Sequence, residues 1–334
     1  MKALVTAIFV DEFLEKLKEK VEVIYEPWFD AEGKLHIKQS VDLVNYLNEN
    51  NIEIFICEPE VLRKDVLSQL TTLKLIVCAK GTEFFIDNDV ATQQNIIVAY
   101  TPGRNANSVA EYAIGLILCI TRDIVNNHNL VAQGKWPILS ALADRGIELN
   151  QKTVGIVGLG AIGFRVGTIL KTFGMKVLVY DPYVKKDRLK ALDAKQVDLD
   201  TLMKESDVVT IHAIVTEETT GMISKEKLEL MKPSAYFINT SRGKIVDEDA
   251  LADLLEQKKI RGAALDVYLR EPIKRKSKLL ELPNLIHTSH IGGSSADVPY
   301  YSSKMAYDEV LRYLEGKPPI NCLNPDVLPK IFKK

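Results

Sequence analysis

Short apolar runs alternate with amphipathic segments along this sequence, and this alternation constrains the fold more than any other feature. In the N-terminal part, the runs KALVTAIF, VEVIYEP, IEIFICEP and LKLIVCAKG are separated by the segments DEFLEKLKEK, VDLVNYLNENN and VLSQLTTL. Continuous apolar runs are typical of strands buried on both faces. The alternation therefore predicts a parallel sheet with helices on both sides.

A second series of the same kind follows a break in the pattern. The turn-rich segment YTPGRNAN leads into the long apolar helix SVAEYAIGLILCITRDI, and a loop is expected over 134–150. Beyond it lie the strand TVGIVG, the helix GAIGFRVGTILKTF and the strands MKVLVYD, DVVTIHAI, AYFINTS, IRGAALDVY and NLIHTSH. A last helix, SKMAYDEVLRYLEG, precedes an extended tail, PPINCLNPDVL. The length of 334 residues suits two domains.

Composition excludes several classes of function. Hydrophobic residues make up 46% and charged residues 26%, as in globular proteins, and the net charge of −2 disfavours nucleic acid as a partner. The N-terminus lacks the features of a signal peptide, and the apolar run Tyr112–Thr121 is too short to span a bilayer. The four cysteines form no metal-binding or redox pattern: Cys57, Cys78, Cys119 and Cys322. We therefore expect no bound metal and a reducing, cytoplasmic location, and we expect no membrane association.

A glycine motif marks the first candidate site. Gly158, Gly160 and Gly163 fit G-x-G-x-x-G, with Ala161 and Ile162 at the variable positions before the third glycine. The motif follows an expected strand and opens an expected helix, which is the context that a dinucleotide site requires. Gly158 allows the tight turn, Gly160 lets the pyrophosphate approach the backbone, and Gly163 lets helix and strand pack closely. The helix N-terminus offers N–H groups to the phosphates.

An acid at the end of the next strand strengthens this prediction. Asp181 lies 23 residues after Gly158, where its carboxylate accepts hydrogen bonds from the ribose hydroxyls of a dinucleotide. The same charge repels a 2′-phosphate, and no arginine follows directly, so NAD is favoured over NADP. The alternative, a βαβ turn with a surface aspartate, explains fewer of these features together.

Three side chains follow later strands: Arg242 in NTSRGKIVDEDAL, Glu271 in LDVYLREP and His290 in HTSHIGG. Arginine matches a carboxylate with two donors, histidine exchanges a proton with an alkoxide, and a glutamate orients the imidazole. This set suits reduction of a 2-oxo acid by a nicotinamide. Taken singly, each residue has another explanation: Arg242 also fits a turn arginine, Glu271 a solvated loop acid and His290 a buried core histidine.

The segments GLGAIG, DVVTIHAIVTEETTGMI, MKPSAYFINTSRGKIVDEDAL, GAALDVYLREP and SHIGG resemble the D-isomer-specific 2-hydroxyacid dehydrogenase family. The likeness runs from about residue 76 to about residue 328 and is weaker in the N-terminal domain. It implies two doubly wound α/β domains: a Rossmann-type NAD-binding domain, 102–294, inserted into a flavodoxin-like substrate domain, 1–101 and 295–334. It also implies that the chain forms a homodimer on the inserted domain.

The resemblance places Arg242, Glu271 and His290 at the family's catalytic positions. It assigns Asp266 to the nicotinamide carboxamide. It adds further cofactor contacts, mainly through the backbone, at Ala213, Thr219, Thr240 and Gly292.

The substrate loop of the first domain departs from the family pattern. Where the family has a glycine-rich loop with an arginine, this chain has CAKGTEFFID, which retains Gly81 and has Ala79 near the place of the arginine. We expect Lys80 and Arg104 to supply positive charge for a substrate carboxylate or phosphate, although Arg104 also fits a solvated turn. Phe84 and Phe85 either narrow the acyl pocket or pack into the core. Ile214 replaces a proline common in the family.

These features predict NAD-dependent interconversion of a D-2-hydroxy acid and its 2-oxo acid. Candidate substrates are 3-phosphoglycerate, glyoxylate or hydroxypyruvate, and sugar-acid derivatives. From the end of the sequence at residue 334, we expect no regulatory domain of the kind found on some phosphoglycerate dehydrogenases. One alternative is an NAD-sensing interaction protein, like the corepressors that share this fold. Formate dehydrogenase chemistry is a weaker alternative, because Glu271 is the acid expected for 2-hydroxy acids.

Overall fold

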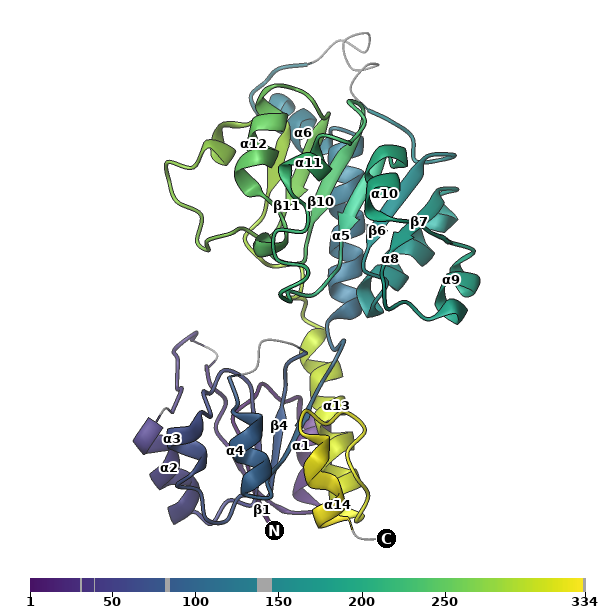
Figure 1. Ribbon diagram of the computed structural model, residues 1–334. Coiled ribbons are helices and arrows are strands. Elements are labelled where there is room, and N and C mark those ends of the chain that lie inside the picture. The colour runs from purple at the N-terminus through teal and green to yellow at the C-terminus, as the bar shows by residue number, and fades with distance from the viewer. Residues whose placement is uncertain (31, 39, 82–84, 137–145, 333–334) are drawn as a thin grey trace. The chain divides into compact units, whose positions relative to one another are not determined.

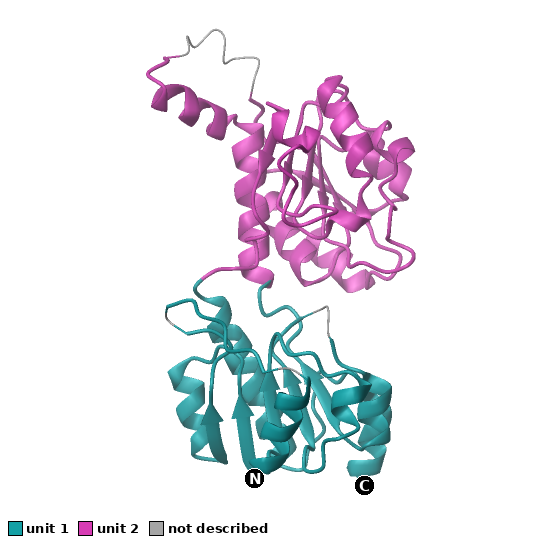
Figure 2. Cartoon of the chain, turned by 90° about the vertical axis from the view of Figure 1, so that its left-hand side faces the viewer, with its two compact units in different colours: residues 1–105, 296–334 teal, residues 106–295 magenta. Residues whose placement is uncertain are grey.

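The computed structural model describes residues 1–334 except 31, 39, 82–84, 137–145 and 333–334. The chain divides into two compact units. Unit 1 comprises Met1–Asn105 and Ala296–Lys334, and unit 2 comprises Ala106–Ser295 (Figures 1 and 2). Unit 2 is thus inserted into the chain of unit 1.

Unit 1 is built on a five-stranded parallel sheet in the order β2-β1-β3-β4-β5, which is the flavodoxin-like order. Its strands are β1 (Lys2–Val5), β2 (Glu22–Tyr25), β3 (Ile54–Cys57), β4 (Leu75–Cys78) and β5 (Ile97–Tyr100). The order reverses between β1 and β3. Open α/β sheets bind ligands beyond the carboxyl ends of their strands at such a point.

Helices cover both faces of this sheet because successive strand residues point to opposite sides. Ile54 and Ile56 pack with α1 (Asp11–Lys18) and α13 (Val298–Leu314), whereas Phe55 and Cys57 pack with α2 (Ser40–Glu49), α3 (Lys64–Leu67) and α4 (Asn88–Gln93). All of these strand residues are buried, as the continuous apolar runs predict. Cys57 and Cys78 are register partners on β3 and β4 with free thiols.

The C-terminal segment protects the edge strand β5. Buried Asn324 accepts from the N–H of Val98 at 2.9 Å and donates to the carbonyl of Ile96 at 2.9 Å. The predicted extended tail is correct only as far as Asn324. Pro325 then opens a 3-10 turn, η3 (Pro325–Val327), and α14 (Leu328–Ile331) follows, because proline suits the first helical position.

Unit 2 contains a seven-stranded parallel sheet in the order β12-β11-β10-β9-β6-β7-β8. Taken from β8 to β12, this order is that of the Rossmann fold with one further strand at the β12 edge. The predicted fold class is therefore confirmed. The strands are β6 (Thr153–Val157), β7 (Lys176–Tyr180), β8 (Lys195–Gln196), β9 (Val208–Ile211), β10 (Tyr236–Asn239), β11 (Gly262–Leu265) and β12 (Leu285–His287).

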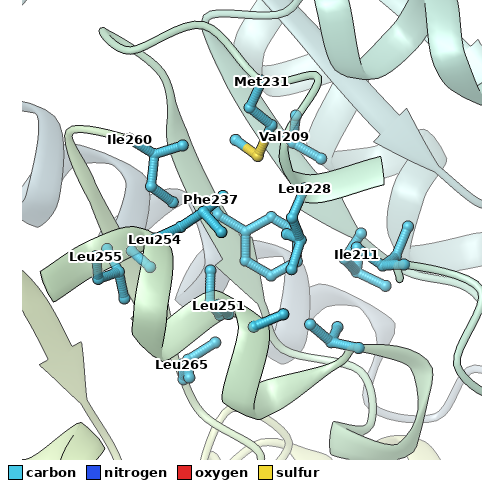
Figure 3. Close-up of a cluster of buried hydrophobic side chains, with 14 of the residues drawn as sticks. Val209, Ile211, Leu228, Met231, Phe237, Leu251, Leu254, Leu255, Ile260 and Leu265 are labelled. Carbon is cyan, nitrogen blue, oxygen red and sulfur yellow. The ribbon is translucent and has the colours of Figure 1, made fainter. Parts of the chain in front are cut away.

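Two apolar layers flank this sheet. One contains α5 (Ala106–Thr121), α8 (Ala161–Thr172) and α9 (Lys186–Leu192). The other contains α10 (Leu199–Glu205), α11 (Lys225–Leu228) and α12 (Glu248–Glu256). Phe237 of β10 is fully buried in the second layer, and Figure 3 shows its ring surrounded by Leu228, Leu251 and neighbouring aliphatic side chains.

Two helix predictions are wrong in their extent. The helix expected to run through SVAEYAIGLILCITRDI ends at Thr121, and a separate helix, α6 (Ile124–Ala132), occupies residues expected to precede a loop. Asp123 takes the left-handed conformation, with φ 54°, which breaks the helix. The helix expected at VLSQLTTL is instead the single turn α3. In the part of the chain that is described, no helix is long and apolar enough to cross a membrane.

Candidate active site

The glycine loop lies at the point where the strand order of unit 2 reverses, between β6 and β9. Gly158 has φ +91°, which L side chains rarely adopt, and a Cβ there would lie 2.7 Å from the backbone nitrogen of Ala213. Only glycine allows the end of β6 to approach the segment after β9 so closely. The loop thus lies at the carboxyl edge of the sheet, where open α/β sheets bind ligands.

The next two glycines serve different purposes. A Cβ at Gly163 would lie 2.1 Å from the carbonyl oxygen of Gly158, so this glycine lets α8 pack against the loop. A Cβ at Gly160 would meet no atom within 4 Å, so space lies open beside it. Gly160 is also the N-cap of α8, whose first N–H groups have no intrahelical partners by geometry. Open space beside free N–H groups suits a pyrophosphate.

Asp181 holds the loop from the end of β7. Its carboxylate accepts from the N–H of Leu159 at 2.8 Å and from the N–H of Tyr183 at 2.9 Å. Arg188 of α9 donates to the carbonyl of Leu159 at 2.8 Å, and its guanidinium lies 5.8 Å from the ring centroid of Phe164. The sequence pattern did not identify Arg188, because its contact depends on how α9 returns to the loop.

The segments that follow β9 and β10 lie at the same edge of the sheet. The hydroxyl of Ser241 donates to the carbonyl of Ala213, which joins the two strand ends. Thr219 donates to the carbonyl of Ile214 at 2.6 Å and so closes the turn after β9. Thr240 is 7% exposed, and its hydroxyl has no partner among the described residues.

His290 and Glu271 form a hydrogen-bonded pair. His290 Nδ1 lies 2.6 Å from Glu271 Oε2, and the two side chains are 43% and 35% exposed. The backbone N–H of Tyr268 donates to the other carboxylate oxygen at 2.9 Å. Burial raises the pKa of the Tyr268 phenol to about 12. The pair occupies Nδ1, so Nε2 is the ring nitrogen left to exchange a proton with a ligand.

Arg242 follows β10, the strand beside β11, so the three predicted catalytic residues follow three adjacent strands. Its Nη1 donates to the carbonyl of Ser241 at 2.8 Å. A Cβ at Gly243 would lie 2.0 Å from the carbonyl carbon of Tyr268. Gly243 therefore lets the Arg242 segment pack directly on the loop that carries Glu271.

In unit 1, Lys80 and Gly81 follow β4. The Nζ of Lys80 lies 5.6 Å from the ring centroid of Phe85, which is 47% exposed. Phe85 does not pack into the core, so that alternative is wrong, and Phe84 lies outside the described residues. Gly81 approaches the turn after β5, with a Cβ position 3.5 Å from the nitrogen of Gly103.

Arg104 is already paired within unit 1. It donates to Glu58 at 2.8 Å, and both side chains are less than a fifth exposed. The indole N–H of Trp28 donates to the other oxygen of Glu58 at 3.0 Å. A substrate anion at Arg104 would have to compete with this carboxylate.

Comparison with known proteins identifies the family. Residues 114–292 match the model of the D-isomer specific 2-hydroxyacid dehydrogenase, NAD binding domain, which covers more than half of the chain. The chain belongs to the D-isomer specific 2-hydroxyacid dehydrogenase family.

Named members of this family and solved structures align with most of the chain. D-3-phosphoglycerate dehydrogenase of Archaeoglobus fulgidus is 35% identical over 88% of the chain, although the chain spans only 59% of that relative. Glyoxylate reductase of Thermofilum pendens is 32% identical over 98% of the chain and 95% of the relative. The solved structure of the TT0316 protein of Thermus thermophilus is 29% identical and superposes with a TM-score of 0.82 over 97% of the chain and 100% of that structure.

NAD is the cofactor that this family model implies, and the residues of unit 2 fit it. The open space at Gly160, the N-terminus of α8 and the carboxylate of Asp181 would hold the pyrophosphate and the adenosine ribose. When bound, the nicotinamide supplies the hydride chemistry. Among the described residues, no group of His, Cys, Asp or Glu side chains could hold a metal ion.

Proposed function

We propose that this 2-hydroxyacid dehydrogenase interconverts a D-2-hydroxy acid and its 2-oxo acid with NAD. The observation that carries the proposal is the His290–Glu271 pair at 2.6 Å, beside the strand that carries Arg242. In the reductive direction, Arg242 binds the substrate carboxylate through two donors. His290 gives the proton on Nε2 to the substrate oxygen, and Glu271 stabilises the imidazolium through Nδ1.

We also propose that Lys80 and Gly81, in the loop after β4, bind substrate. We further propose a cytoplasmic homodimer whose subunits associate through α6. This helix has no buried residue, and it exposes Ile124, Val125 and Val131 by 49%, 39% and 49%. Apolar side chains gathered on one exposed helix suit a second copy of the chain.

The test is NADH oxidation by the purified protein across glyoxylate, hydroxypyruvate, phosphohydroxypyruvate and sugar-derived 2-oxo acids, with NADPH in parallel. We expect turnover with NADH and a loss of roughly 10²–10⁴-fold in kcat for His290→Ala. His36→Ala is a matched control, because His36 pairs with Asp30 at 2.9 Å and is also 43% exposed.

No turnover with any 2-oxo acid, despite NADH binding, would overturn the dehydrogenase proposal and favour the NAD-sensing alternative. Equal losses in His290→Ala and His36→Ala would remove the specific role of His290. A strong preference for one member of the panel would identify the substrate class.

A further inference from the structure

Two buried cysteines lie side by side at the carboxyl ends of β3 and β4. Cys57 and Cys78 are far apart in the sequence, but they are register partners in the sheet of unit 1. Both side chains belong to the apolar cluster on the face that α2, α3 and α4 cover. Cys57 is 1% exposed, Cys78 is 3% exposed, and both thiols are free. Neither thiol takes part in the proposed hydride transfer.

The placement of the two cysteines suits a disulfide bond. Neighbouring parallel strands lie about 4.7–4.9 Å apart, and disulfides join residues whose Cα atoms are about 4.4–6.8 Å apart. Register partners on parallel strands also direct their side chains to the same face of the sheet. The backbone of β3 and β4 therefore already holds Cys57 and Cys78 within the range of a disulfide.

The two thiols differ in how readily they lose a proton. A hydrogen bond from the Cys57 thiol lowers the pKa of Cys78 below its ordinary value of 9.0, although burial opposes this shift and the charge of Lys80 adds to it. The hydrogen bond with Cys78, together with burial, raises the pKa of Cys57. Because the thiolate is the form that oxidants attack, Cys78 is the reactive sulfur and Cys57 the one that resolves it.

We propose that Cys57 and Cys78 form a redox-sensitive dithiol that hydrogen peroxide converts to a disulfide. The Cys78 thiolate attacks one peroxide oxygen, the O–O bond breaks, and a sulfenic acid and hydroxide form. The Cys57 thiol then attacks the oxidised sulfur, the S–S bond forms, and the sulfenic oxygen leaves as water. In total, two thiols and one peroxide give one disulfide and two waters, so two electrons pass from sulfur to oxygen.

The burial of both thiols selects a small oxidant. A sulfur in a residue that is at most 3% exposed is closed to a molecule as large as glutathione disulfide, whereas hydrogen peroxide is little larger than water. The two remaining cysteines, Cys119 and Cys322, are both more exposed and lie in different units. They therefore serve as internal controls for oxidation by exposure alone.

The disulfide would join the starts of two charged loops. Glu58 follows Cys57 directly, and Lys80 lies two residues after Cys78. The N–H of Ala79 already donates to the carbonyl of Cys57 at 2.7 Å, so a shift at one sulfur is passed to the other loop. The proposed function assigns Lys80 to the substrate, and the kinetic consequence of the disulfide rests on that function.

We expect oxidation to raise the KM of the 2-oxo acid by roughly tenfold, the size expected when one hydrogen bond to a charged group is lost. The Kd of NADH should stay within about twofold of the reduced protein, because the cofactor residues belong to unit 2. Treatment with dithiothreitol should restore the KM. The formation of the disulfide itself can be measured without turnover.

The test is to treat the folded full chain with hydrogen peroxide and to count free thiols after denaturation. The count should fall from four to two, and peptide mapping should find Cys57 joined to Cys78. Glutathione disulfide at the same concentration should leave all four thiols free.

Single variants separate the two steps. Cys57→Ser should stop the reaction at the sulfenic acid of Cys78, which dimedone traps, whereas Cys78→Ser should leave Cys57 reduced at the same dose of peroxide. Cys119→Ser is the matched control and should form the disulfide as wild type does. If serine prevents folding at either buried position, Cys57→Ala and the peptide map of oxidised wild type answer the same question.

An unchanged thiol count, a disulfide that includes Cys119 or Cys322, or a glutathione adduct in place of the internal bond would overturn the dithiol. A disulfide that forms without any change in KM would overturn its effect on substrate binding. A reduced protein that turns over no 2-oxo acid would overturn the proposed function alone, because the thiol count does not depend on turnover.

Discussion

Gly163→Ala and Gly160→Ala should separate the packing role of the glycine loop from its ligand role. A Cβ at position 163 would lie 2.1 Å from the carbonyl oxygen of Gly158, whereas real Cβ atoms essentially never come within 3.0 Å. The difference of about 0.9 Å must be met by moving the backbone of the loop or of α8, because the obstructing atom belongs to the backbone. At position 160, a Cβ meets nothing within 4 Å.

The expected magnitudes follow from this contrast. Overpacking costs about 1–3 kcal/mol, so Gly163→Ala should lower the Tm by about 2–4 °C for each kcal/mol in a unit of this size. Gly160→Ala should leave the Tm nearly unchanged in the absence of cofactor. Both variants should weaken NADH binding, because one moves the loop and the other fills the space for the pyrophosphate.

The assay is thermal unfolding with and without NADH, together with NADH titration by fluorescence. At 100 times its Kd, NADH stabilises the native protein by about 2.7 kcal/mol, and this increment should shrink in both variants. Gly115→Ala is the control: it lies on α5 with no atom within 4 Å of its Cβ, and it should stabilise by roughly 0.5–1 kcal/mol. Unaltered NADH affinity in Gly160→Ala would refute the pyrophosphate assignment, and unaltered stability in Gly163→Ala would refute the packing argument.

Three predictions concern stability. Burial raises the pKa of the Glu60 carboxyl above its ordinary value of 4.5, so ionisation of this group destabilises the native state as the pH rises above 4.5. Glu60→Gln should therefore stabilise the protein against urea at pH 7. The gain should vanish at pH 4 if burial is the cause. Burial lowers the pKa of His212 from 6.5 to about 3, so the native state should lose stability as the pH falls from 6.5 towards 3. If His212→Gln shows the same dependence of the unfolding free energy on pH, His212 is not the cause of this loss. Phe237→Ala should cost about 3–5 kcal/mol in urea unfolding, and a cost below about 1 kcal/mol would mean that the surrounding side chains collapse into the space.

Much of the candidate site could be predicted because its signals are local. The three glycines lie within six positions of one another, each with a role set by backbone geometry, and their context of strand and helix is contiguous in sequence. The βα alternation likewise records, run by run, which strands are covered on both faces. Arg242, Glu271 and His290 were each ambiguous alone, and only the resemblance to a family brought them together.

The sequence by itself therefore determined the two parallel sheets, the glycine loop and the acid that follows it, since each depends on residues close together in the chain. The tertiary structure alone decided which distant groups meet. It paired His290 with Glu271, closed three donors around Asp266 and joined Arg104 to Glu58, because strand order and register, not spacing, bring those ends together. It also ended α5 at Thr121 through the left-handed Asp123, where local helix propensity predicted continuation.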